Sequence, residues 1–453
     1  MNPNRTTIPM AFLAVLAALP LAAGEPEAAP PPPPPAPVHV TLEEAVTAAL
    51  EANPGLKALS HRTEAARRDA RAAGRTRWGS LDAFFQYTRF NDDWMVRPMS
   101  REMFEAAGGF LGLPWDRNQR HYGLRFELPL YMGGELSNGI RIRDLEAESA
   151  AALLEGTRWQ VRFNAVSLYT AVQTLDQTMQ ALDGLVAALE KTKERLDLMV
   201  SSGKRPELDR LKVVESLEAA RARRAGVRAD RVRAAALLLA LMGRDPSGEL
   251  ETDPLPDRIP RLTVPAPELR TAAKESTAVR RARFAAEQGE RGVKVATASF
   301  IPHVVASGDL TQNAAPSVDD PLDTWQVSVG VVVPIFHGAS RFESLAAAKE
   351  RSHAAREALA QAEQDAVARL EEALARFEAA KASLAAARAR VAAGDEAARI
   401  EQIRYDTGAG TIEDLLRARS HEEEAQAGLA AARGGVVTAA ERINSIVEKE
   451  AVQ

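Results

Sequence analysis

Cysteine and histidine are common nucleophiles and metal ligands, so their number and spacing limit the chemistry that the chain can carry out. The chain has no cysteine, which excludes disulfides, thiolate metal sites and a cysteine nucleophile. None of its seven histidines has a partner at a metal-ligand spacing. They are His39, His61, His121, His303, His337, His353 and His421. We therefore expect no catalytic site, no metal site and no cofactor.

Two adjacent carboxylates in the segment Thr411-Ile412-Glu413-Asp414 are the next candidates. A threonine followed by acidic residues is typical of a helix start, where the hydroxyl caps free backbone N–H groups. The acids then lie near the positive end of the helix dipole. Asp414 and Arg417 are three residues apart and could form an ion pair on that helix.

Composition points to long helices rather than to a polyanion-binding protein. The net charge of the 453-residue chain is −5, which gives no reason to expect a nucleic-acid partner. Charged residues make up 26% of the chain and aromatic residues only 5%. Long stretches consist of Ala, Leu, Glu, Arg and Lys, the composition of coiled coils.

The first 24 residues have the features of a cleaved secretory signal. Arg5 precedes the uncharged apolar run from Ile8 to Leu21, and small residues follow it. A membrane anchor is the alternative, but the run is shorter than the ~20 residues of a spanning helix and contains two prolines. Residues 25–40 then form a proline-rich linker.

Two landmarks recur at one spacing in the remaining chain. Pro129-Leu130-Tyr131-Met132-Gly133 returns 205 residues later as Pro334-Ile335-Phe336-His337-Gly338. Gly203 returns at the same spacing as Gly408. This predicts an internal duplication, with repeats at 41–265 and 266–453. Each repeat reads strand, loop, strand, long helix, tight turn, long helix.

Four segments show the period-two alternation of strands. In residues 120–130, apolar Tyr122, Leu124, Phe126 and Leu128 alternate with mostly polar neighbours. The other strands are expected at about 81–90, 300–311 and 324–334. One polar face suits a soluble sandwich as well as a membrane barrel. Four strands leave two open edges, which lipid does not tolerate, so a membrane location would require several chains to share one barrel.

The long helices are predicted from a sustained heptad pattern without proline. Residues 135–202 would span about 100 Å as a helix. Their apolar seam steps by three and four through Leu168, Val172, Leu175, Met179, Leu182, Val186, Leu189, Leu196 and Val200. Residues 341–406 repeat the pattern, and glycine follows both helices. Hairpin tips are expected at 201–208 and 406–412, and residues 244–267, rich in proline, form an irregular connection between the repeats.

With these features, the chain resembles the TolC-like outer-membrane factor family over nearly its whole mature length. The resemblance rests on the first helix (Leu42 to Leu56), on the two Pro-Gly junctions and on the tip Tyr405-Asp406-Thr407-Gly408-Ala409-Gly410-Thr411. It implies a homotrimer whose 12-stranded barrel lies in outer-membrane lipid of a Gram-negative bacterium. The helices would form a periplasmic tube that docks onto an adaptor and an inner-membrane transporter. The chain would be the passive exit duct of a tripartite efflux or type I secretion system.

The same resemblance assigns roles to particular residues. It implies a periplasmic pore constriction at Glu413 and Asp414, although Arg417 stands where some relatives have a second acid. The loop 91–119 would face outside the cell. Adaptor docking is implied at the tips, by Gly203, Lys204, Arg205, Gly408, Gly410, Thr411 and Leu415. Membrane-interface aromatics are expected at Trp94, Trp115, Tyr122 and Trp325.

Two other functions remain open from the residues alone. A periplasmic adaptor also has a helical hairpin, and a coiled-coil scaffold also has long helices. Duplication, with a strand pair inside each repeat, disfavours both. The sequence does not identify the cargo, which could be a drug, a metal or a protein.

Overall fold

The computed structural model describes residues 38–98, 100–108, 113–336 and 338–452. The predicted signal peptide and most of the predicted linker lie outside these residues. The helices are α1 (Leu42–Ala52), α2 (Pro54–Arg75), η1 (Thr76–Trp78), α3 (Arg101–Ala106), α4 (Glu135–Ser201), α5 (Glu207–Leu241), α6 (Ala266–Lys274), α7 (Thr277–Ala298), α8 (Ser340–Asp406) and α9 (Ile412–Val447). The strands are β1 (Val38–Val40), β2 (Ser80–Met95), β3 (Trp115–Tyr131), β4 (Leu250–Thr252), β5 (His303–Ala314) and β6 (Leu322–Val332).

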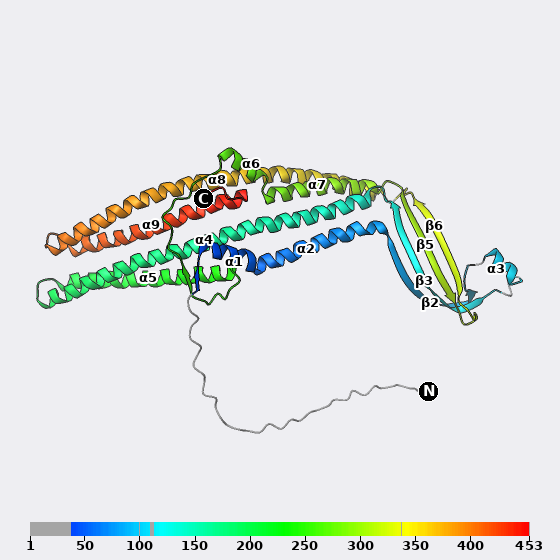
Figure 1. The fold of residues 1–453 in the computed structure, drawn as a ribbon, viewed down its shortest axis with the longest axis horizontal. Coiled ribbons are helices and arrows are strands. Elements are labelled where there is room, and N and C mark those ends of the chain that lie inside the picture. Colours follow the sequence, from blue (N-terminus) through cyan, green and yellow to red (C-terminus); the bar gives the residue numbers. More distant parts are fainter. Residues whose placement is uncertain (1–37, 99, 109–112, 337, 453) are drawn as a thin grey trace, which may run out of the picture. The chain divides into compact units, whose positions relative to one another are not determined.

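The same element order occurs twice, which confirms the predicted fold class of two strands and two long helices per repeat. β2, β3, α4 and α5 correspond to β5, β6, α8 and α9 (Figure 1). α4 and α8 each contain 67 residues. Each begins directly after a residue in the left-handed conformation, Gly134 (φ 90°) or Ala339 (φ 61°). The sharp turn at the two Pro-Gly landmarks therefore redirects the chain from a strand into a long helix.

The four long strands form one antiparallel sheet in the order β2-β3-β5-β6. β2 and β3 extend beyond the predicted ends, so residues 91–95 and 115–119 belong to strands and the connection between them is shorter than the expected loop 91–119. After an irregularity between Arg89 and Trp94, the strands pair again through Met95 and Trp115. The rings of Phe90 and Trp94 stack at 5.4 Å across this irregularity. Period-two alternation fails at such a bulge, which explains the wrong boundary.

The two faces of the sheet differ sharply in polarity. On one face the register aligns Leu81, Phe126, Gly308 and Val327 in one row across the four strands. The next row toward the strand tips holds Leu124, Leu310 and Trp325 with Ala83. On the opposite face, Arg125 lies 2.5 Å from Asp309, whose other oxygen accepts a hydrogen bond from Gln326 at 2.9 Å. Many apolar side chains of the first face are exposed, such as Val327 at 66%.

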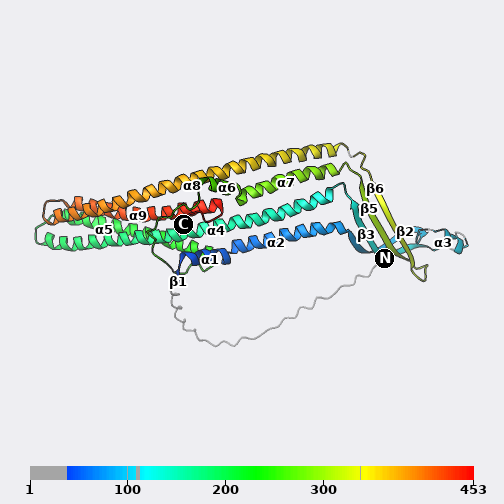
Figure 2. The same cartoon turned by 45° about the horizontal axis from the view of Figure 1, so that its top comes forward.

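The helices pack side by side, with the strands at one end and the two hairpin turns at the other (Figures 1 and 2). α4 contacts α2 and α7 in the half near the sheet, and α5 and α9 in the half near the turns. The predicted seams supply the core, because Leu182, Leu189 and Leu196 of α4 are buried. On α8, Leu370, Phe377 and Leu384 are buried in the same way. The predicted heptad pattern therefore marks the packed face of each long helix.

No described helix has both the length and the apolar character that a bilayer span requires.

The connection between the repeats is more ordered than its proline content predicts. β4 lies within 244–267 and pairs in parallel with β1, at the end of the expected linker. Tyr169 of α4 donates its hydroxyl to the Val40 carbonyl at 3.0 Å, and the same oxygen accepts the Asp253 N–H at 3.0 Å. A buried tyrosine therefore ties both chain segments to the helices.

In each repeat, two shorter helices meet end to end. In the first repeat, Asn53 donates its side-chain amide to the Leu241 carbonyl of α5 (2.9 Å) and caps the N–H of Leu56 in α2 (3.0 Å). In the second, Glu448 follows α9 and accepts the N–H and the hydroxyl of Thr277, the first residue of α7, at 2.9 and 2.5 Å. One side chain thus bridges each helix junction and satisfies backbone groups that would otherwise lack partners.

We expect Glu448→Ala to lower the free energy of unfolding by about 1 kcal/mol, the usual effect of losing a helix cap. Burial raises the pKa of the Glu448 carboxyl, so part of the gain from its hydrogen bonds is already offset. The matched control is Ser276→Ala, because Ser276 occupies the N-cap position of α7 but its side chain makes no capping hydrogen bond. Thermal unfolding in detergent should show the larger loss in Glu448→Ala. Equal losses in both variants would contradict the capping role.

Candidate functional site at the hairpin tips

The two hairpin turns share one backbone geometry. Gly203 and Gly408 both have positive φ, 69° and 79°. In the first turn the Lys204 N–H bonds the Met199 carbonyl at 2.8 Å, and in the second the Ala409 N–H bonds the Arg404 carbonyl at 2.8 Å. Such bonds close a helix on a left-handed residue, for which glycine has no steric penalty. The recurring glycines therefore build the turns whatever else the tips do.

The two tips of one subunit pack against each other through a common apolar cluster. Leu196, Val213 and Leu217 come from the first hairpin, and Tyr405 and Leu415 from the second. Tyr405 is only 3% exposed, and burial raises the pKa of its hydroxyl. That hydroxyl has no hydrogen-bond partner among the described residues. No hydrogen bond of the hydroxyl thus holds this side chain, which is fixed by the contacts of its ring.

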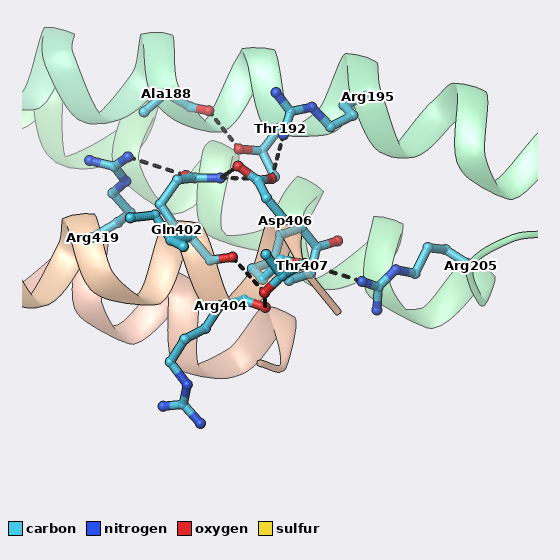
Figure 3. Close-up of polar contacts among 11 residues, drawn as sticks. Ala188, Thr192, Arg195, Arg205, Gln402, Arg404, Asp406, Thr407 and Arg419 are labelled. Atoms are coloured by element: carbon cyan, nitrogen blue, oxygen red, sulfur yellow. Dashed lines mark hydrogen bonds and ion pairs between the residues drawn. The ribbon is translucent and has the colours of Figure 1, made fainter. Parts of the chain in front are cut away.

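Polar contacts between the hairpins surround this cluster (Figure 3). Arg195 of α4 forms an ion pair with Asp406 at 2.5 Å. The Arg205 guanidinium lies 4.8 Å from the centre of the Tyr405 ring, and its Nη2 lies 3.4 Å from the Tyr405 carbonyl oxygen. Lys212 of α5 pairs with Glu413 of α9. In each of these contacts the first hairpin supplies the cation and the second supplies the carboxylate or the aromatic ring.

A second layer of hydrogen bonds holds the acceptors in place. Gln402 donates to both carboxylate oxygens of Asp406 at 3.2 Å. Arg419 of α9 in turn donates to the Gln402 side-chain oxygen at 3.2 Å (Figure 3). Arg223 of the first hairpin pairs with Glu423 at 3.2 Å farther along, where burial raises the pKa of the Glu423 carboxyl. Several separate polar contacts thus connect the two hairpins at the tips and farther along.

The acidic residues expected at the pore lie at this site, but in different environments. Asp414 is half-buried and accepts the Thr411 hydroxyl at 2.8 Å, while the Thr411 oxygen accepts the Asp414 N–H at 3.2 Å. This is the helix start that the sequence predicts. Glu413 is exposed, and its contact with Lys212 lowers its pKa. The expected Asp414–Arg417 ion pair is absent from the described structure. The Asp414 carboxylate instead accepts a hydrogen bond from Thr411, the N-cap residue of the same helix.

The residues expected at the docking surface divide into two groups. Lys204, Gly203, Gly408 and Thr411 are exposed at the turns. Arg205 is mostly covered, since 28% of its side chain is exposed while it contacts Tyr405. Leu415 is buried in the tip cluster. The structure therefore makes Arg205 and Leu415 internal contacts of the subunit.

Sequence reasoning placed Asp406 in the second tip but did not find its partner Arg195, and it missed Arg195 and Lys212 as tip residues. Their partners are about 200 positions away, a separation at which no helix periodicity applies. A signal was nevertheless present, because residues 204–212 contain four Lys or Arg and two Asp or Glu, whereas residues 404–414 contain three Asp or Glu and one Arg. Opposite charge on two tips of the same geometry predicts that they attract each other.

The four aromatic side chains expected at a membrane interface all lie on β2, β3 or β6. Trp94, Trp115, Tyr122 and Trp325 are between 37% and 73% exposed. Tyr122 stacks with Phe85 at 6.5 Å on the apolar face. Within the part of the chain that the structure describes, no group of histidine, aspartate and glutamate side chains is placed to hold a metal ion.

Comparison with known proteins identifies the family. The family model "Outer membrane efflux protein" matches residues 45–244 and 269–447. VceC of Vibrio cholerae is 19% identical, with a TM-score of 0.76 over 90% of this chain and 96% of that one. The CmeC channel of Campylobacter jejuni is 16% identical, with a TM-score of 0.78 over 90% and 86%. The open-state MtrE channel of Neisseria gonorrhoeae is 18% identical, with a TM-score of 0.73 over 90% and 89%. A search of curated protein sequences found no match.

The duplicated hairpins and the shared sheet define a channel subunit rather than an adaptor or a scaffold. The chain belongs to the outer membrane efflux protein family. Its place is the outer membrane of a Gram-negative bacterium, with the helices in the periplasm, and its role is that of an exit duct for efflux. Members of the family are channels rather than enzymes, form trimers and work with periplasmic adaptors and inner-membrane pumps.

Proposed function

We propose that three copies of this chain close one 12-stranded barrel and one periplasmic tube. The four-stranded sheet carries the argument, because β2 and β6 each have one edge without a partner strand in the described chain. An open edge is unstable in lipid, whereas pairing of β6 with β2 of the next copy removes every edge. The exposed apolar face of the sheet would then face lipid and the Arg125–Asp309 face the lumen.

The mass of the detergent-extracted complex tests this proposal. A trimer recovered from the outer-membrane fraction is the expected result. A monomer or dimer from the soluble periplasmic fraction would overturn it, because the apolar face would then have to be covered within one or two chains.

At the other end, the tips would form the periplasmic opening of the channel and contact the adaptor. Exposed Lys204 and Thr411 are the side chains best placed for that contact, together with the backbone at Gly203, Gly408 and Gly410. Through the adaptor, the duct would work with an inner-membrane transporter. The transporter would supply the energy and most of the cargo selection.

Carboxylates near this opening would favour cations. Three copies of Asp414, flanked by Glu413 and Arg417, would place a charged ring at the constriction. Because Lys212 already pairs with Glu413, Asp414 is expected to contribute most of the free negative charge.

We expect Asp414→Asn to lower the cation-to-anion permeability ratio about threefold, the size of an exposed charge interaction. Asparagine retains an oxygen that can accept the Thr411 hydroxyl, so the helix start should survive. Glu396→Gln, on α8 away from the tip, is the control for a general loss of negative charge. The measurement is the reversal potential across a planar bilayer under a salt gradient. An unchanged ratio in Asp414→Asn would show that Asp414 only caps its helix.

A further inference from the structure

A cavity lies where the sheet joins the helices, beside the short helix η1. Its volume is about 370 Å³, at the lower end of the range for small-molecule sites. The wall consists mainly of apolar side chains from the end of β3 and the start of α4: Leu130, Tyr131, Met132, Leu136 and Ile140. Arg77 of η1 is the one charged residue in the lining.

The cavity lies at the border of the apolar face of the sheet. Along β3 that face runs through Tyr122, Leu124, Phe126 and Leu128; Leu130, which enters the cavity wall, follows at the irregularity between Pro129 and Tyr131. Beyond Leu130 the chain turns into α4. A span of nine strand residues, tilted as in membrane barrels, matches the ~25 Å apolar band of such barrels. The cavity is therefore at the level where acyl chains meet headgroups on the periplasmic side.

The side chains around the cavity suit this boundary. Trp78, next to Arg77, is 79% exposed, and Tyr131 is 52% exposed. Amphipathic aromatic rings are favoured at the membrane–water interface. Nothing in the described chain covers Trp78, which ends η1 two residues before β2 begins at Ser80.

Arg77 retains an uncompensated charge at this position. Its Nε donates to the Gly74 carbonyl at the end of α2, at 2.9 Å. No carboxylate of the described residues lies within ion-pair distance of it, although most arginines on α4, α5 and α8 have one. The Nη groups are thus available for an anion, and guanidinium groups bind phosphate oxygens with two parallel hydrogen bonds.

We propose that this cavity binds an anionic phospholipid of the periplasmic leaflet, with an acyl chain against Leu130, Leu136 and Ile140 and the phosphate on Arg77. The lining supports this occupant, since an apolar wall beside a cation without an ion-pair partner is complementary to a lipid chain and its headgroup. The inference rests on the proposed membrane location of the sheet, which the mass measurement tests separately.

Lipid retention is the first test. The purified trimer is incubated with phosphatidylglycerol, and the lipid bound per trimer is measured by native mass spectrometry. We expect Arg77→Gln to retain about fivefold less, as for one basic residue at an anionic membrane surface. Arg75→Gln is the matched control, because Arg75 is an exposed arginine on the same helix end but does not line the cavity. Equal retention in the two variants would overturn the assignment to Arg77.

Tryptophan quenching tests the position of the lipid. In a variant that keeps Trp78 and replaces the other four tryptophans by phenylalanine, brominated lipid in contact with the site should quench emission. The expected result is stronger quenching by brominated phosphatidylglycerol than by brominated phosphatidylethanolamine, with the difference lost in Arg77→Gln. Absence of quenching in an intact trimer would mean that a neighbouring subunit covers the cavity, and would overturn the proposal. Loss of the trimer itself would instead refute the shared barrel.

Discussion

Removing the cations that link the two hairpin tips, in the triple variant Arg195→Ala, Arg205→Ala and Lys212→Ala, should raise the single-channel conductance several-fold. These residues hold Asp406, Tyr405 and Glu413 of the second hairpin. The Arg205–Tyr405 contact is the strongest of the three, because it is largely covered; stacking of this kind contributes about 1 kcal/mol, or about fivefold in a two-state equilibrium. The two exposed ion pairs add less individually.

Three subunits would lose these contacts together, so the second hairpins could move away from the channel axis. The measurement is conductance in planar bilayers at low and high salt. High salt screens the exposed ion pairs. After correction for the higher ion concentration, wild-type conductance at high salt should therefore be closer to that of the variant. Ring stacking is less sensitive to salt, so full convergence is not expected.

The first hairpin offers a control of equal charge. Arg210, Arg221 and Arg224 pair only with carboxylates of their own hairpin, such as Asp197 and Glu190. Replacing all three by alanine removes the same number of cations without cutting a link between hairpins. Conductance near the wild-type value is expected. If the two triple variants conduct alike, the tip contacts do not restrain the opening.

Charge exchange between partners gives a second check on one link. Arg195→Asp should mimic part of the triple variant, and adding Asp406→Arg should restore wild-type conductance by re-forming the pair with reversed sign. Rescue of this kind depends on the contact itself and not on either residue alone. If wild-type conductance is not restored, the hydrogen bonds from Gln402 to Asp406, and not the ion pair with Arg195, hold the second hairpin.

Local rules were sufficient to predict the long helices. The absence of proline and the seam through Leu182, Leu189 and Leu196 predict one continuous helix whose buried face is known in advance. The turns at Gly203 and Gly408 follow equally well, since a left-handed residue is needed there. Each of these features depends on residues a few positions apart, which is the range over which sequence patterns carry information.

The ends of β2 and β3 and the tip contacts depend on longer-range geometry. An irregularity between Arg89 and Trp94 interrupts the alternation, so the pairing of Met95 with Trp115 is invisible to a period-two pattern. Arg205 was expected on the docking surface, but the Tyr405 ring, 200 residues away, covers it. Such contacts require knowledge of how the two repeats pack, which neither repeat encodes by itself.

A single arginine on the apolar face of the sheet should prevent assembly in the membrane. Val327 lies in the middle row of that face, between the Leu130 and Tyr122 levels of β3, and is 66% exposed. At the midplane of a bilayer, arginine costs about 2–4 kcal/mol on the lipid face of a barrel strand. In a trimer Val327→Arg imposes that cost three times. We expect little or no trimer in the outer-membrane fraction.

The adjacent residue provides the matched control, because successive side chains of a strand point to opposite faces. Ser328 lies on the polar face, where its hydroxyl is 2.9 Å from that of Ser307. Ser328→Arg adds the same charge and volume one position away and should assemble with only a modest loss. Because strand propensity and edge pairing are nearly the same in the two variants, a difference in trimer yield can come only from what each face contacts. Equal yields would mean that Val327 does not face lipid, and the assignment of the two faces would have to be exchanged or abandoned.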